Sequence, residues 1–136
     1  MSLDENRLSG NVCARETPRV APLACAAPGV KLWWCELRAS ALQLRHCYSV
    51  LCDSERTRAA RYGVESLRDR YVIGRAGLRL VLGRSLGVPP VEVPIIHGER
   101  GRPRLAQDAV LDFNVSHTGD VALLGTLAGA RLGVDV

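Results

Sequence analysis

Apolar residues follow two different periods along the chain, and the change of period predicts where strands and helices lie. The segment VKLWWCELR (30 to 38) alternates and is rich in residues that favour strands. Alternation places Leu32, Trp34 and Glu36 on one face of this strand. The other face carries Lys31, Trp33 and Cys35. We expect a short helix over about 40–51, and Asp53 or Ser54 as the cap of the segment ERTRAARY that follows.

The longest helix is predicted from about Ser66 to Leu86. Ser66 and Asp69 form a Ser-x-x-Asp variant of the capping box, and Gly87 with two prolines beyond it stops the helix. At about 100° per residue, one face collects the residues expected to pack, which are Leu67, Tyr71, Gly74, Leu78, Val81 and Leu82. An adjacent stripe carries Arg68, Arg75 and Arg79.

Beyond Pro90 the pattern changes to short apolar runs separated by turn-rich segments. The predicted strands are 91–97, 111–116, 121–127 and 130–136. Since the connections are short and the helices come first, we expect an α+β fold in which packed helices cover one face of a small, mostly antiparallel sheet.

The length of 136 residues is enough for one core, so we expect a single domain over 30–136 preceded by a flexible N-terminal leader over 1–29. The apolar stretch 20–30 is too short to span a bilayer and is interrupted by prolines. We therefore expect no membrane partner.

The five cysteines all lie in the first half of the chain and include no C-x-x-C pair. An odd number without metal-ligand spacing argues against a zinc site and against a closed disulfide framework. A reducing cytoplasm is the expected compartment.

The formal charge of +4 comes from 18 basic residues, of which only Lys31 is a lysine. Arginine suits phosphate because its planar guanidinium donates two parallel hydrogen bonds. A solvated basic surface is the alternative interpretation. A nucleic-acid module ranks last, because no nucleic-acid motif is present and few aromatic residues are available for stacking.

Two arginine-rich segments are candidates for binding a polyanion. Gly101-Arg102-Pro103-Arg104 is a turn that projects two arginines, and RTRAAR (56 to 61) supplies more. These arginines could equally lie over apolar surface with their charged ends in water.

Two strand ends carry further candidates. In FNVSHTGD, Ser116 and His117 lie where a predicted strand runs into a tight turn, and such a pair could donate hydrogen bonds to phosphate. Neighbouring strand residues point to opposite faces, so a local Ser-His catalytic dyad is not expected. Asp135 lies in the last predicted strand, and a carboxylate at position 137 would share its face and complete a magnesium-binding edge.

These segments together resemble the N-terminal half of the surfactin-type 4′-phosphopantetheinyl transferases. The matching segments, in order, are SERTRAARY, RYVIGRAGLRLVLG, GRPRL, FNVSHTGD and LGVDV. The resemblance implies one half of a pseudo-dimer of two similar α+β halves, with coenzyme A and Mg²⁺ held in the cleft between them. It implies transfer of the 4′-phosphopantetheine arm from coenzyme A to a serine of an acyl or peptidyl carrier protein.

The resemblance also implies roles for individual residues. Arg58 and Arg102 are expected to contact the coenzyme phosphates, and Ser116 and His117 match the family's coenzyme-contacting pair. Asp135 matches the first acid of the family's Asp-x-Glu magnesium motif. Tyr71 aligns with a position near the nucleotide, although it also fits the packed helix face.

No catalytic base is identified in this chain. The second metal carboxylate and the Trp-x-x-Lys-Glu segment of the family would lie beyond residue 136. We therefore expect a truncated form of the enzyme, with a non-catalytic remnant that binds coenzyme A or a carrier protein as the alternative.

Overall fold

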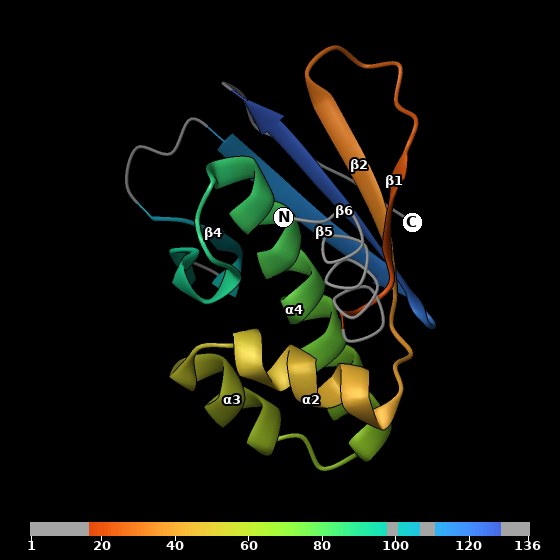
Figure 1. Cartoon of the computed structure of the whole chain (residues 1–136), viewed down its shortest axis with the longest axis vertical. Coiled ribbons are helices and arrows are strands. Elements are labelled where there is room, and N and C mark those ends of the chain that lie inside the picture. Colours follow the sequence, from red (N-terminus) through yellow and green to blue (C-terminus); the bar gives the residue numbers. More distant parts are fainter. Residues whose placement is uncertain (1–16, 98–100, 107–110, 129–136) are drawn as a thin grey trace, which may run out of the picture.

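A four-stranded antiparallel sheet carries the long helix on one face (Figure 1). The structure, a computed structural model, describes residues 17–97, 101–106 and 111–128. The strands are ordered β1 (Val20–Leu23), β2 (Val30–Glu36), β6 (Val121–Ala128) and β5 (Leu111–Thr118). All three pairings are antiparallel, so the predicted α+β class with a mostly antiparallel sheet is confirmed.

The sheet is held by long pairings of its central strands. β2 pairs with β6 from Val30 opposite Leu127 to Glu36 opposite Val121. β5 and β6 form a hairpin whose turn contains Gly119 at φ +54°, a left-handed conformation that favours glycine. The alternation expected for the first of these strands is confirmed at Cys35, which is fully buried on the face toward the helices.

The edge strand β1 lies inside the range expected to be leader. Residues 20–23 pair with β2, from Val20 opposite Cys35 to Leu23 opposite Leu32. This part of 1–29 is therefore a strand of the sheet, because its backbone completes the ladder along β2. Residues 1–16 lie outside the described residues.

Two short helices precede the long one and pack against it near the bottom of Figure 1. α2 (Ala41–Val50) begins at a capping box, in which the Ser40 hydroxyl accepts from the Gln43 backbone N–H at 3.2 Å. α3 (Asp53–Ala60) has Cys52 at the cap position, whereas the sequence predicted Asp53 or Ser54 there. The Glu55 carboxylate accepts the Cys52 backbone N–H at 3.0 Å, which fits a helix that starts at Asp53.

α4 (Glu65–Leu86) is the predicted long helix, and it ends at Gly87 with φ +70° as the sequence indicates. The predicted Ser66–Asp69 capping box is wrong. Val64 holds the cap position, and the Asp69 carboxylate instead accepts from Arg68 at 3.2 Å.

The buried part of α4 extends beyond the predicted face, because Val72 and Ala76 are also buried. Leu78, Val81 and Leu82 are buried as predicted, but Leu67 is 46% exposed because it lies in the first turn. Gly77 allows the closest approach to the sheet, since a Cβ there would lie 2.9 Å from the Cys35 sulfur.

The segment after α4 differs from the strand predicted over 91–97. Pro90–Glu92 form a 3-10 turn (η1), and only Ile95–His97 form a strand (β3), because a proline at the first position of the turn favours helical backbone angles. β3 pairs with β4 (Pro103–Leu105) in a two-stranded ribbon. The strand predicted over 130–136 lies outside the described residues.

Within the described residues, no helix is both long and apolar enough to cross a membrane. Cys25, Cys35, Cys47 and Cys52 are free thiols, and Cys35 and Cys47 are buried. Burial is the main reason that the pKa of each of these two thiols is raised to about 12.

Candidate phosphate-binding cleft

A cleft of about 560 Å³ opens between α3, the first half of α4, β4 and the β5–β6 hairpin. Its walls are largely apolar, and six of the residues that line it have cationic or aromatic side chains. These residues are Arg58, Tyr62, Arg70, Tyr71, Arg75 and His117. Cationic and aromatic groups in a partly apolar concavity are suited to an organic phosphate.

Tyr71 is the centre of this lining. The Arg58 guanidinium carbon lies 5.3 Å from the centre of the Tyr71 ring, and that of Arg75 lies 5.5 Å from it. The Tyr62 ring is tilted by 31° at a centroid distance of 5.5 Å. Burial raises the pKa of Tyr71 and outweighs the opposing effect of Arg75, so its hydroxyl stays protonated at neutral pH.

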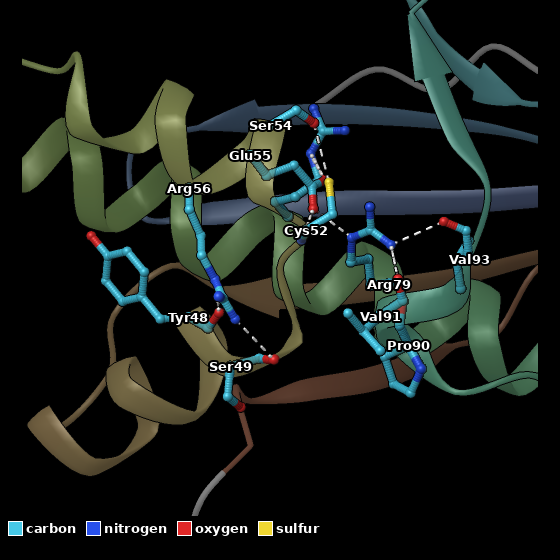
Figure 2. A network of polar contacts seen from close by, with 11 residues as sticks. Tyr48, Ser49, Cys52, Ser54, Glu55, Arg56, Arg79, Pro90, Val91 and Val93 are labelled. Carbon is cyan, nitrogen blue, oxygen red and sulfur yellow. Dashed lines mark hydrogen bonds and ion pairs between the residues drawn. The ribbon is translucent and has the colours of Figure 1, made fainter.

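A buried ion-pair network lies beneath the cleft, and Figure 2 shows Glu55 pointing toward Arg79. Arg79 Nε donates to Glu55 Oε1 at 2.6 Å, and the two side chains are 2% and 3% exposed. Arg79 Nη1 donates to the backbone carbonyls of Pro90 and Val93 at 3.0 Å and to that of Val91 at 3.3 Å. Arg79 therefore joins α3, α4 and η1.

The same carboxylate reaches the cleft lining. Glu55 Oε2 lies 3.5 Å from Arg75 Nε, and the Arg75 side chain is 10% exposed. Glu55 thus contacts one arginine that is committed to the core and one that lines the cleft.

A second cluster fixes the hairpin beside His117. Asp120 Oδ2 accepts from Arg38 at 2.9 Å and 2.7 Å, and its Oδ1 accepts from Arg70 at 3.0 Å. Hydrogen bonds and charge from Arg38, and then from Arg70, hold the pKa of Asp120 below its usual range. The turn is therefore tied to the end of β2 and to α4.

The structure brings two of the predicted site residues together. Arg58 and His117 both line the cleft, from α3 and β5. Ser116 is half-buried on the opposite side of β5, since neighbouring strand residues alternate. Arg102 lies at the edge, where its guanidinium is 3.7 Å from the Asp112 carboxylate, while its neighbour Pro103 lines the cleft.

The predicted magnesium ligand Asp135 lies outside the described residues. Among the residues that are described, no three His, Cys, Asp or Glu side chains come together to hold a metal ion. The described part therefore provides no test of that site.

Sequence reasoning missed Arg70, Tyr62 and the cleft role of Arg75. The sequence showed Arg75 only as one member of an arginine stripe. Its spacing of one helical turn from Tyr71 could have predicted that the two side chains are neighbours. Arg70 and Tyr62 carried no comparable pattern.

Comparisons with known proteins indicate the family of the chain. The family profile described as "4′-phosphopantetheinyl transferase, N-terminal" matches residues 36–128. The chain is 32% identical over 123 residues to the 4′-phosphopantetheinyl transferase HetI of Nostoc sp., and the match covers 88% of this chain and 52% of HetI. It is also 40% identical over 70 residues to the 4′-phosphopantetheinyl transferase AcpT of Escherichia coli, covering 51% of this chain and 32% of AcpT.

A phosphopantetheinyl transferase of Thraustochytrium sp. is 32% identical over 88 residues, covering 63% of this chain and 31% of that protein. The chain therefore spans about half, or less, of the length of the curated relatives that it matches. The family profile nevertheless covers most of the chain, including every helix of the described part and both strands of the hairpin. By this match, the chain belongs to the 4′-phosphopantetheinyl transferase family through its N-terminal domain.

Proposed function

We propose that this chain takes part in moving the 4′-phosphopantetheine arm of coenzyme A to a serine hydroxyl of an acyl or peptidyl carrier protein, as part of a surfactin-type enzyme. The observation that carries the proposal is the cleft in which Arg58, Tyr71, Arg75 and His117 converge. Coenzyme A presents a diphosphate and a 3′-phosphate, which are the groups that such a lining would recognise.

The cleft would act by positioning. Phosphoryl transfer requires the attacking hydroxyl, the phosphorus and the leaving oxygen to lie in line, so cations that fix the diphosphate accelerate the reaction. Arg58 supplies a guanidinium that is held over the Tyr71 ring, and His117 is presented by a hairpin that Asp120 anchors. These groups would restrict how the coenzyme turns in the cleft.

The remaining site residues are proposed from the family resemblance. Arg102 would extend the phosphate contacts at the edge of the cleft. Ser116 stays a predicted coenzyme contact through the resemblance alone, since its side chain lies on the side of β5 opposite to His117. Asp135 would be a ligand of Mg²⁺, which would offset negative charge on the diphosphate. The cytoplasm is the proposed compartment, because it keeps thiols such as those of the described cysteines reduced.

The transfer assay uses the whole chain with coenzyme A, Mg²⁺ and an apo carrier protein, followed by mass spectrometry of the carrier. A carrier that gains the mass of the arm would support the proposed transfer. Binding of coenzyme A without any transfer would favour the non-catalytic remnant. Neither binding nor transfer would refute the proposed function.

A matched pair of variants tests the role of the cleft. Arg58→Gln should weaken coenzyme A binding by about tenfold, since it removes a charge that faces phosphate. Arg84→Gln removes an exposed arginine from the last turn of α4, outside the cleft lining, and should leave binding unchanged. Equal affinities of the two variants would contradict the assignment of the cleft.

A further inference from the structure

Arg75 is a buried cation with part of its hydrogen-bonding capacity unused. Its side chain lines the cleft and is 10% exposed, and its Nε lies 3.5 Å from Glu55 Oε2. Its Nη1 is buried, and none of the described residues accepts a hydrogen bond from it. Buried donors normally have an acceptor, so this nitrogen requires an explanation.

Tyr71, one helical turn earlier on α4, shows the same feature. Its hydroxyl is buried and has no hydrogen-bond partner among the described residues. Both side chains line the same cleft, and the ring of one contacts the guanidinium of the other. Two neighbouring donors without acceptors, on the wall of one cleft, indicate a ligand oxygen as their shared acceptor.

The local charge favours an anion. Arg58, Arg75 and Arg79 provide three positive charges around this part of the cleft, whereas Glu55 is the one carboxylate that contacts Arg75 and Arg79 in the described part. Arg79 is committed to Glu55 and to three backbone carbonyls, so it cannot turn toward a ligand. Of the two arginines that contact Glu55, Arg75 is therefore the one that remains available to a ligand.

His97 does not add to this charge. Burial, followed by the positive charges of Arg75 and Arg58, lowers the pKa of His97, so its imidazole is neutral at pH 7. The positive charge available to a ligand therefore comes from the arginines.

We propose that Arg75, oriented by Glu55 and assisted by the Tyr71 hydroxyl, binds a phosphate group inside the cleft. A phosphate fits better than a carboxylate because it offers three acceptor oxygens to a guanidinium edge and a separate hydroxyl. Glu55 is a positioning residue, since its Oε2 lies 3.5 Å from Arg75 Nε while Arg75 Nη1 has no partner among the described residues. The identity of the phosphate as one from coenzyme A rests on the proposed function.

Two variants test the proposal through their affinity for coenzyme A, and the thermal midpoint shows whether the fold is intact. Tyr71→Phe removes only the unpaired hydroxyl, so it should keep or raise the thermal midpoint while weakening coenzyme A binding by about fivefold. Arg75→Lys keeps the charge but cannot serve both Glu55 and a phosphate, so binding should weaken by about tenfold. Tyr48→Phe and Arg84→Lys are the matched controls outside the cleft and should bind as the unsubstituted chain does.

Calorimetry with three ligands identifies the phosphate. Coenzyme A, dephospho-coenzyme A and adenosine 3′,5′-bisphosphate are titrated into each variant. If Arg75 and Tyr71 hold the 3′-phosphate, the loss should disappear with dephospho-coenzyme A. If they hold the diphosphate, the loss should persist with dephospho-coenzyme A, and it should disappear with the bisphosphate only if the phosphate held is the one bonded to the pantetheine arm.

The outcomes separate this inference from the proposed function. Unchanged binding of every ligand by Tyr71→Phe and Arg75→Lys would overturn the inference, even if the unsubstituted chain transfers the arm. Weakened binding in these variants would support it, even if no transfer occurs. Failure of the unsubstituted chain to bind any of the three ligands would overturn it as well.

Discussion

Replacing Glu55 with alanine tests how far the buried network holds the cleft together. The substitution removes the acceptor of Arg79 Nε at 2.6 Å and the partner of Arg75 Nε at 3.5 Å. It also removes the acceptor of the Cys52 backbone N–H at 3.0 Å. Arg79 would keep its three carbonyl acceptors, but its charge would have no counterion in a site that is 2% exposed.

The expected loss of unfolding free energy is about 3–5 kcal/mol, the cost of removing one partner from a buried ion pair. Most of this cost is the desolvated charge left on Arg79 rather than the lost attraction. A domain of this size has a total stability of roughly 5–15 kcal/mol, so the variant would lose a large part of it. The cost is large because water cannot reach the pair to replace the missing carboxylate.

Urea denaturation followed by circular dichroism gives the difference in unfolding free energy. Glu65→Ala is the matched control, because Glu65 also lies in the first turn of a helix and pairs with Arg68 at 3.7 Å, but with an 81% exposed side chain. It should cost less than about 0.5 kcal/mol. A loss below about 1 kcal/mol for Glu55→Ala would refute the argument that the buried charge dominates.

A double variant, Glu55→Leu with Arg79→Met, separates charge burial from the other contacts. It removes both charges of the pair, so it should be more stable than Glu55→Ala despite carrying more substitutions. Three carbonyls lose their donor in this variant, so recovery should be incomplete. A double variant less stable than Glu55→Ala would show that the contacts of Arg79 to η1 matter more than the unpaired charge.

Three further predictions follow from other parts of the fold. Gly77→Ala should lower the unfolding free energy from a urea titration by about 1 kcal/mol or more, because its Cβ would lie 2.9 Å from the Cys35 sulfur. Gly74→Ala is the control, since its Cβ meets only a leucine methyl at 3.4 Å, and it should raise the unfolding free energy by up to about 1 kcal/mol. The arginines around Asp120 lower its pKa in the folded state. The thermal midpoint of the unsubstituted chain should therefore exceed that of Asp120→Asn at pH 7, and the difference should shrink below about pH 4. A difference that does not change with pH would contradict this. Burial raises the pKa of the Cys35 thiol to about 12, so at pH 8 a maleimide should label the exposed Cys25 quickly and Cys35 only after unfolding, as mass spectrometry of peptides would report.

Local patterns were enough to predict most of the elements. α4 was predicted to within one residue at each end, because a run of helix-forming residues stops at a glycine that adopts φ +70°. β5 and β6 were predicted from apolar runs flanking a turn that contains Gly119. These signals depend on backbone preferences and on residues close in the sequence, so they can be interpreted without knowing the partners.

The candidate site was only partly predictable for the same reason. Arg58 and His117 were identified through the family resemblance, and the structure brings them to one cleft. The cleft role of Arg75 was missed, because an arginine on a helix stripe has the same period whether it faces water or a buried carboxylate.

The chain by itself therefore determined the α+β class, the long helix and the hairpin, since each follows from the spacing of neighbouring residues. Only the tertiary structure decided that Glu55 meets Arg79, a residue 24 positions away, and that two guanidinium groups lie against the Tyr71 ring. It also decided that residues 20–23 join the sheet. The physical reason is that burial turns an ordinary charged residue into a structural or ligand-binding one, and burial depends on which distant elements pack around it.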